Sequence, residues 1–166
     1  MKVEEDFKVE EIKLQFNPIK QPNNRTCVAT CLAIIVGERT EYVLDWFQGN
    51  PSYTMEDAFI FLAHHGIYLG FFFRPIDDSF FTLDSNSEIS LPLFPMKYRP
   101  CLLCVNSKRF MKKLHMVFWD GMDVLDPASG TKEDICSYEI LEVWPLILTE
   151  NRYNDLIHRR KLPTNG

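Results

Sequence analysis

The sequence predicts an α+β domain whose amino-terminal half is helical and whose carboxyl-terminal half forms an antiparallel sheet. Residues 27–36 read CVATCLAIIV, an apolar run that ends at a glycine, which is typical of a helix buried in the middle of a domain. Residues 114–126 hold an Asp-Gly pair between two apolar segments, which is typical of a β-hairpin. Helices followed by strands is the order found in α+β folds.

The composition fits a single globular domain over residues 1–166. Hydrophobic residues make up 46% of the chain and charged residues 25%, which is enough apolar content for one core. The net charge of -5 argues against a nucleic-acid partner, which would need a basic surface. No apolar stretch approaches the about 20 residues of a membrane span. The start MKVEEDFKVEEIK is unlike a secretory signal, so we expect a cytoplasmic protein without a membrane partner.

The first expected elements are a short strand at residues 12–16, behind a charged lead, and the buried helix 27–36. Thr26 is the expected N-cap of this helix because its hydroxyl can accept a bond from a first-turn amide. Gly37 is the expected C-cap because glycine tolerates the left-handed conformation found there. The first residue of the helix is then a cysteine, Cys27.

Two further helices are expected before the sheet. One follows Thr40 and ends at Gly49. The other begins near Thr54, where Asp57 lies at capping-box spacing, and stops at Gly66. The residues that we expect it to present to the core are Ala58, Phe59 and Leu62.

The carboxyl-terminal half predicts short strands around one long irregular segment. We expect an aromatic strand at 68–74, a buried strand at 101–105 and another short strand at 144–149. Residues 76–99 mix Ser, Asp, Asn and Pro with aromatic residues, and a loop of that length is usually functional or mobile. A last helix is expected from residue 151 to just before Pro163.

The hairpin geometry brings a histidine beside an aspartate. If Asp120 and Gly121 form a two-residue type I′ turn, residues pair outwards from Trp119 opposite Met122 until His115 faces Asp126. Directly opposite side chains have Cβ atoms about 4.5–5.5 Å apart. A carboxylate there would orient the imidazole, as in a catalytic triad. Taken in isolation, the pair is more often a structural cross-strand hydrogen bond.

Cys27 is the candidate nucleophile among five cysteines, whose odd number favours free thiols over a disulfide framework. A helix N-terminus offers amides and a positive dipole end, which favour the thiolate. The alternative is a small buried hydrophobic residue, which is how we interpret Cys31 one turn later. Gln21, in the loop before the helix, is either an oxyanion donor or only a polar loop residue.

Two segments resemble the motifs of the C39-type cysteine peptidases. QPNNRTCVATCLAIIVG is similar to the first motif, in which a glutamine and five further residues precede a nucleophilic cysteine that opens a buried helix. PCLLCV followed by HMVFWDGMDVLDPASG is similar to the second, with a proline-led strand, a histidine-bearing strand and an Asp-Pro-Ala-x-Gly turn. The resemblance covers about residues 20–130, and its order of Gln, Cys, His and Asp is the papain-like one.

The resemblance implies a papain-like fold and a set of site residues. Cys27 would be the nucleophile, His115 the general base and acid, and Asp126 the group that orients it. Gln21 and the backbone N–H of Cys27 would form the oxyanion hole, and no cofactor or metal is implied. Val28 follows the cysteine where members that process peptides usually carry glycine, so the likeness is closer to stand-alone C39-like proteins of bacteria and phages.

The function that follows is a cysteine hydrolase that acts on a peptide, an isopeptide or a glutamine side chain by acyl transfer. Residues 76–99 would then form a substrate rim, with Phe80, Phe81 and Phe94 as contacts. The alternative is a catalytically idle, peptidase-like binding protein that engages a host or partner protein through exposed aromatic residues, Phe72 among them.

A zinc site is a third interpretation of the cysteines. It would use Cys27, Cys31, Cys101 and Cys104. It is disfavoured because one pair lies in an apolar helix, and on a strand positions three apart point to opposite faces.

Overall fold

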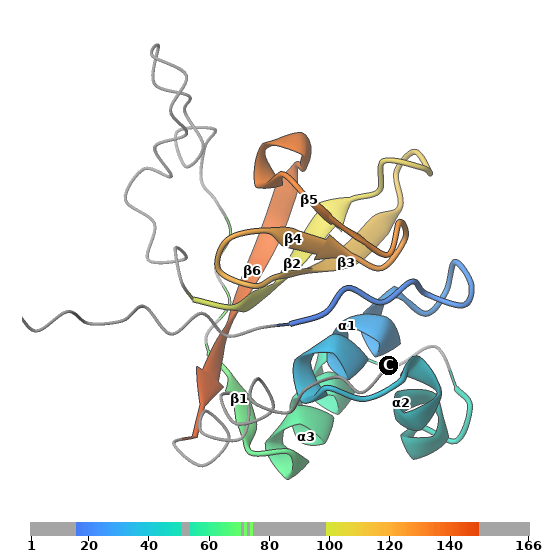
Figure 1. Ribbon diagram of the computed structural model, residues 1–166, viewed down its shortest axis with the longest axis vertical. Helices are drawn as coiled ribbons and strands as arrows, with labels where there is room; N and C mark the ends of the chain where they lie inside the picture. Colours follow the sequence, from blue (N-terminus) through green and yellow to red (C-terminus); the bar gives the residue numbers. More distant parts are fainter. Residues whose placement is uncertain (1–15, 51–53, 71, 73, 75–98, 150–166) are drawn as a thin grey trace, which may run out of the picture.

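The computed structural model describes residues 16–50, 54–70, 72, 74 and 99–149 (Figure 1). The expected last helix and almost all of the expected irregular segment 76–99 lie outside the described residues. Of the expected strand 12–16 only Phe16 is described. It belongs to no strand and packs edge-on against Phe118 of the sheet, with ring centroids 4.8 Å apart.

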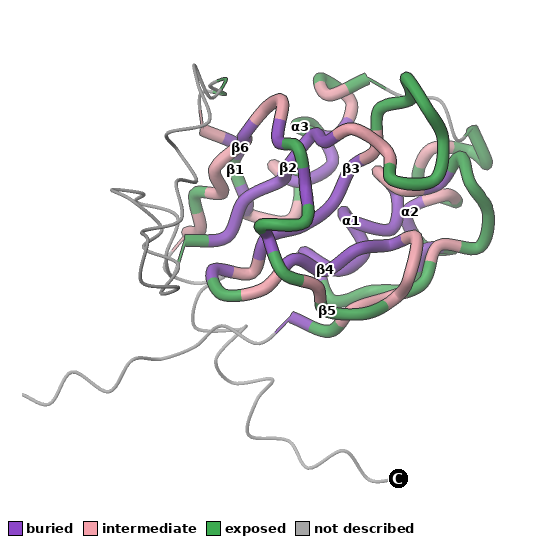
Figure 2. Tube along the Cα trace, turned by 90° about the horizontal axis from the view of Figure 1, so that it is seen from above, coloured by how far each residue is buried: buried purple, intermediate pink, exposed green. Residues whose placement is uncertain are grey.

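Three helices form the amino-terminal part of the described fold, as predicted: α1 (Cys27–Val36), α2 (Thr40–Trp46) and α3 (Met55–His64). Gly37 ends α1 at φ 74°, where its N–H donates to the Ala33 carbonyl. Thr54 and Asp57 form the expected capping box at the start of α3. Buried residues occupy most of α1, which confirms a central helix without a polar face (Figure 2).

The core-facing side of α3 differs from the expected one at Phe59. Its side chain is 42% exposed, whereas Phe61 is fully buried together with Ala58 and Leu62. The physical reason is the helical repeat of 3.6 residues, which puts positions 58, 61 and 62 on one face and turns position 59 by about 100° away from it. The prediction for Phe59 is therefore wrong.

The strands form one six-stranded sheet in which every neighbouring pair is antiparallel, with the order β1-β6-β2-β3-β4-β5. The strands are β1 (Ile67–Leu69), β2 (Cys101–Asn106), β3 (Leu114–Trp119), β4 (Val124–Asp126), β5 (Thr131–Glu133) and β6 (Ile140–Leu148). The fold is thus α+β, with the helices gathered on one side of the sheet and α1 nearest to it (Figure 1). Among the described residues, no helix has the length and apolar character needed to cross a membrane.

Two strand predictions need correction, and one strand was missed. The expected strand 68–74 is only β1, because pairing with β6 stops after Leu69 and the Gly70 N–H then donates to the Pro145 carbonyl. The expected strand 144–149 is the second half of β6. This strand begins earlier than expected, at Ile140, and its first half pairs with β2. The polar β5 lacks the apolar alternation that would have predicted it, and a 3-10 helix, Ile135–Ser137, follows it.

The hairpin register also differs from the prediction, by two residues. Trp119 pairs with Val124, so the loop has four residues and the expected two-residue type I′ turn is wrong. The Asp120 carboxylate accepts bonds from the Met122 and Asp123 amides, each at 2.8 Å, and this Asx-turn closes the longer loop. Because side chains alternate with a period of two, a slip of two residues leaves every side chain on its expected face.

The sheet buries side chains on both faces. One face packs with the helices, and its cluster includes Leu102, Met116, Phe118 and Leu125. The other face is covered by the chain that runs from β5 into β6, with Tyr138 in its cluster. The packing on the two faces of the sheet holds the amino end of α1 and the first residues of β3 in place. The candidate site lies between these two points.

Candidate active site

The amino end of α1 presents Cys27 with its first-turn amides uncapped. Thr26 occupies the expected N-cap position but forms no side-chain cap; its hydroxyl donates to the Asn23 carbonyl at 3.0 Å instead. The Asn23 side chain in turn accepts a bond from the Arg25 amide at 2.9 Å. The Val28 amide is therefore available to bond the Cys27 sulfur, together with the backbone of Met116.

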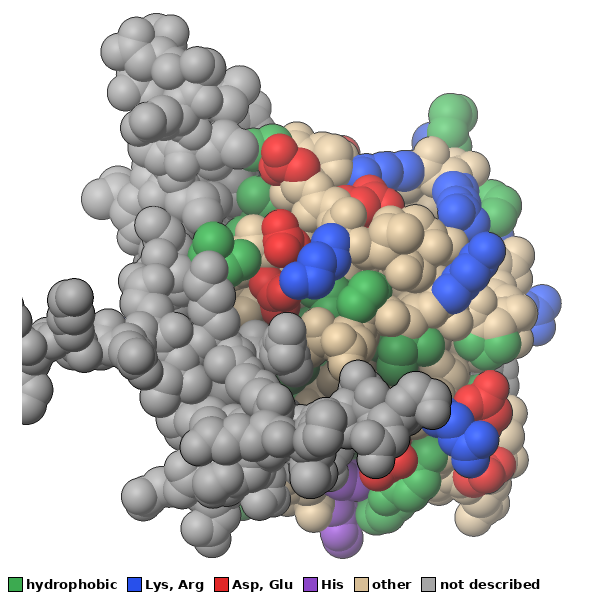
Figure 3. All heavy atoms as spheres, in the orientation of Figure 1, with side chains coloured by type: hydrophobic (Ala, Val, Ile, Leu, Met, Phe, Trp, Pro, Cys, Tyr) green, Lys and Arg blue, Asp and Glu red, His purple; other side chains and the backbone are tan. Residues whose placement is uncertain are grey.

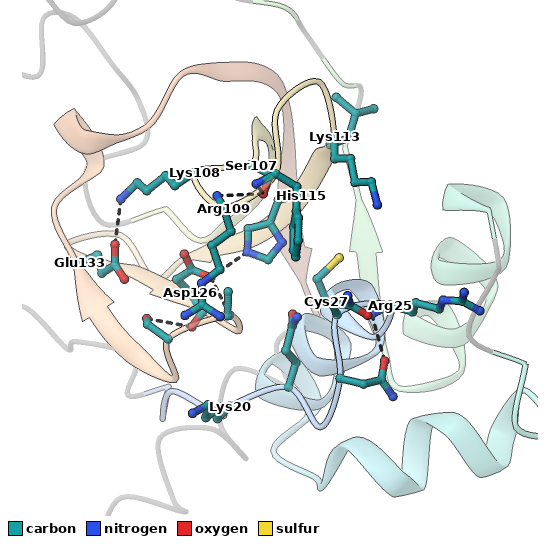
Figure 4. Close-up of a pocket in the computed structure, with 17 residues that line it drawn as sticks. Lys20, Arg25, Cys27, Ser107, Lys108, Arg109, Lys113, His115, Asp126 and Glu133 are labelled. Atoms are coloured by element: carbon teal, nitrogen blue, oxygen red, sulfur yellow. Dashed lines mark hydrogen bonds and ion pairs between the residues drawn. The ribbon is translucent and has the colours of Figure 1, made fainter.

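His115 and Asp126 form the hydrogen bond that the sequence predicts, although by a different register. The Nε2 of His115 lies 2.7 Å from Oδ1 of Asp126 (Figure 4). The observed register, extended by one pair, puts Val117 opposite Asp126, so His115 reaches the carboxylate diagonally along the same face. Because Nε2 is engaged by Asp126, Nδ1 is the ring nitrogen left to interact with the Cys27 thiol.

The Asp126 carboxylate is held by two further donors. The Ala128 amide donates to Oδ1 and the Tyr138 hydroxyl lies 2.7 Å from Oδ2. The same hydroxyl lies 2.7 Å from a carboxylate oxygen of Glu133, which Lys108 neutralises at 2.8 Å. Asp126 is only 5% exposed, so this network fixes the orientation of the group that orients His115.

These contacts set the ionisation of the three side chains. Burial acts to raise the pKa of Cys27, but the hydrogen bonds from His115 and Met116 and the imidazolium charge outweigh it, and the pKa lies below its usual 9.0. Burial lowers the His115 pKa, yet the bonds to Asp126 and Cys27 raise it to about 9. The Asp126 pKa is lowered, because the bonds from His115 and Tyr138 outweigh burial. The lowered pKa of Cys27 and the raised pKa of His115 both shift the balance towards the thiolate–imidazolium pair and away from the neutral thiol and imidazole.

The other four cysteines behave as ordinary or buried thiols. Burial raises the pKa of Cys31, Cys101 and Cys104, and burial with the Asp134 charge raises that of Cys136. Cys104 belongs to the cluster on the helix side of the sheet and Cys101 to the cluster on the opposite face, so the four-cysteine zinc site is not assembled. Within the described part of the chain, no three His, Cys, Asp or Glu side chains gather as metal ligands.

Gln21 lies in the same cleft, with its side-chain amide unused. Its backbone N–H donates to the Pro127 carbonyl at 2.8 Å, which ties the loop before α1 to the turn after Asp126. Its Oε1 is buried without a hydrogen-bond partner among the described residues. Leaving such a group unpaired costs about 1–3 kcal/mol. No hydrogen bond with the described residues ties the Gln21 carboxamide down, and its Nε2 is the atom that would donate to an oxyanion, whereas the unpaired Oε1 is an acceptor.

The cleft has a volume of about 400 Å³ and contains Cys27, His115, Asp126 and Gln21 in its lining. The structure thus brings the four sequence-predicted site residues together. Phe80, Phe81 and Phe94, the expected rim, lie outside the described residues. Phe72, which we expected among exposed contacts, is 46% exposed and stacks on Trp144 with ring centroids 4.7 Å apart.

Sequence reasoning missed Tyr138, Glu133 and the basic residues of the cleft. Tyr138 and Glu133 lie on segments with no motif. The contact of the Tyr138 hydroxyl with Asp126 and with Glu133 depends on how the chain crosses the sheet after β5. The basic character of the cleft was missed because the net charge of the whole chain is negative. A signal for some of the basic residues was present, because residues 108–113 read KRFMKK directly before the histidine-bearing strand.

Gly130 allows the turn after Asp126 to lie against the loop that carries Gln21. It has φ +73°, and a Cβ added there would lie 2.7 Å from the Cβ of Lys20. Since Lys20 directly precedes Gln21, a side chain at position 130 would push the oxyanion candidate away from the rest of the site.

We expect Gly130→Ala to lower both stability and site reactivity, and Gly49→Ala to lower stability only. Gly49 also has a positive φ, +75°, but an added Cβ meets nothing within 4 Å, so it carries only the backbone cost of about 1–2 kcal/mol. Urea denaturation and the rate of p-nitrophenyl acetate hydrolysis measure the two effects. Equal values for both variants would contradict a coupling between Gly130 and Gln21.

Comparison with protein-family models, with curated proteins and with solved structures finds no match for this chain. The site is therefore interpreted from its own geometry.

Proposed function

We propose that this protein is a cysteine hydrolase of the papain-like, C39-like kind, with Cys27 as nucleophile. The observation that carries the proposal is that Cys27 lines the same cleft as the hydrogen-bonded pair of His115 and Asp126, with His115 close enough to lower the pKa of the thiol. A nucleophile, a base and a group that orients the base is the arrangement that acyl transfer requires. The lowered pKa of Cys27 supports it, since the thiolate is the attacking species.

The reaction proceeds through a thioester. The Cys27 thiolate attacks the carbonyl carbon of an amide, a carbon–sulfur bond forms, and the carbonyl electron pair moves onto oxygen. Gln21 and the Cys27 backbone N–H donate to that oxyanion. When the intermediate collapses, the carbon–nitrogen bond breaks and the His115 imidazolium gives its proton to the leaving amine. Water then attacks the thioester, His115 takes its proton, and a carboxylic acid leaves as the thiolate is restored.

The pH dependence follows from the pKa shifts. Activity needs the thiolate, so its acid limb follows the ionisation of Cys27 below pH 9. It also needs the imidazolium proton, so its alkaline limb falls near the His115 pKa of about 9. The expected profile is bell-shaped, with its alkaline limb near pH 9.

A library of synthetic peptides, read by mass spectrometry, tests the proposal directly. New cleavage products should form with the wild-type chain and be absent with Cys27→Ala. If neither cleavage nor a thioester on Cys27 forms, the hydrolase proposal fails and the idle binding protein becomes the better interpretation.

A further inference from the structure

The cleft around Cys27 is basic, although the protein as a whole is acidic. Five Lys and Arg residues line it against two carboxylates, whereas the complete chain has a net charge of -5. The cations are Lys20, Arg25, Lys108, Arg109 and Lys113. In Figure 3, Lys and Arg side chains gather towards the side where Figure 1 shows the β2–β3 loop and the segment leading to α1.

The two carboxylates in the cleft are already engaged. Asp126 bonds His115, Tyr138 and Ala128, and Glu133 pairs with Lys108. The remaining four cations are exposed and form no ion pair with the described residues. Like charges facing one cleft repel each other, so an anionic ligand would be attracted to the cleft.

The cations lie on both sides of the nucleophile. In the view of Figure 4, Lys113 and Arg25 lie on one side of Cys27, while Lys20 and Arg109 lie on the side of His115 and Asp126. They come from two walls of the cleft, the loop before α1 and the loop between β2 and β3. A ligand that crosses Cys27 in an extended form would meet positive charge before and after the reacting bond.

We infer that the substrate of this site is an acidic polypeptide segment, with Asp or Glu on both sides of the scissile amide. This inference rests on the proposed function, because the acyl transfer cleaves an amide that links two parts of a polypeptide, and the backbone of a nucleic acid contains no amide. Phe110 and Leu114, on the wall formed by the loop between β2 and β3, have exposed apolar side chains that add contacts suited to a peptide. The specificity residues are Arg109 and Lys113 on one wall and Lys20 and Arg25 on the other.

Protection of Cys27 from iodoacetamide tests the inference without requiring turnover. The probes are three ten-residue peptides of one design, in which five positions are all Glu, all Gln or all Lys. The Glu peptide should halve the alkylation rate at a concentration roughly tenfold or more below that of the Gln peptide at low salt. This advantage should shrink in 0.5 M salt, because charges about 10 Å apart are then screened.

Variants assign the effect to the cleft. Arg109→Gln/Lys113→Gln, which removes two of the four cations, should clearly reduce the advantage of the Glu peptide. Each variant is compared with its own alkylation rate in the absence of peptide. Lys132→Gln is the matched control, since Lys132 pairs with Asp120 and Asp123 and does not line the cleft. Equal protection by the Glu and Gln peptides, or stronger protection by a single-stranded oligonucleotide, would overturn the inference.

The peptide library separates this inference from the proposed function. Cleavage without enrichment of Asp and Glu near the cut would reject the acidic substrate and leave the hydrolase standing. Charge-dependent protection without any cleavage would reject the hydrolase and leave the acidic-peptide site.

Discussion

His115→Ala slows the alkylation of Cys27 by iodoacetamide about tenfold or more at pH 6. The substitution removes the hydrogen bond and the positive charge that outweigh burial, so the pKa of Cys27 rises and the thiolate fraction falls. Intact-mass measurements between pH 5 and 9 give the rate. The wild-type rate should rise to its plateau at a lower pH than the rate of the variant.

Cys136 serves as an internal reference in the same measurement. It is exposed and its pKa is raised, so it should follow an ordinary thiol profile in every variant. Asp126→Asn should give an intermediate rate, because His115 keeps its contact with Cys27 but loses the carboxylate that raises its own pKa. An alkylation rate at Cys27 that is indifferent to both substitutions would refute the thiolate–imidazolium pair.

Gln21→Ala lowers the rate of acyl transfer about 10²–10³-fold, the usual cost of losing one oxyanion donor. Its stability should stay the same or rise, because the Gln21 side chain makes no hydrogen bond with the described residues that an alanine would break, and the substitution removes the buried, unpaired Oε1. Hydrolysis of p-nitrophenyl acetate measures the rate, and urea denaturation measures the free energy of unfolding.

The alkylation rate of Cys27 distinguishes this role from a general disturbance of the site. Alkylation by iodoacetamide forms no oxyanion, so Gln21→Ala should leave it within about twofold of the wild type, whereas His115→Ala should not. Gln21→Asn is the matched control, since it keeps the amide and moves it by one methylene. A Gln21→Ala variant that loses alkylation and hydrolysis together would show that Gln21 holds the structure instead.

Much of the fold follows from local patterns in the sequence. The apolar run that starts at Cys27 and the glycine that ends it specify α1, and the capping box at Thr54 specifies the start of α3. β2 was expected because its apolar residues are continuous, whereas β5 was missed because its residues are polar. The face of α3 was misjudged at Phe59, where an aromatic residue is exposed beside a buried one.

The association of His115 with Asp126 was predicted from the sequence by an incorrect turn. The prediction survived because the true register is shifted by two residues, an even number, which preserves the face on which both side chains lie. A shift of one residue would have separated them. The face is therefore a property of the alternation in the sequence, while the loop length was decided by the Asp120 side chain.

The sequence by itself determined the residue types and their order: a cysteine that opens a buried helix, a glutamine before it, and a histidine and an aspartate on one hairpin. Only the tertiary structure decided that these four line one cleft, that Tyr138 and Glu133 complete the network behind Asp126, and that basic side chains surround Cys27. The physical reason is the distance along the sequence over which each kind of interaction acts. Caps, turns and alternation act over a few residues, whereas the field of a cleft sums charges from loops that meet only after the sheet has formed.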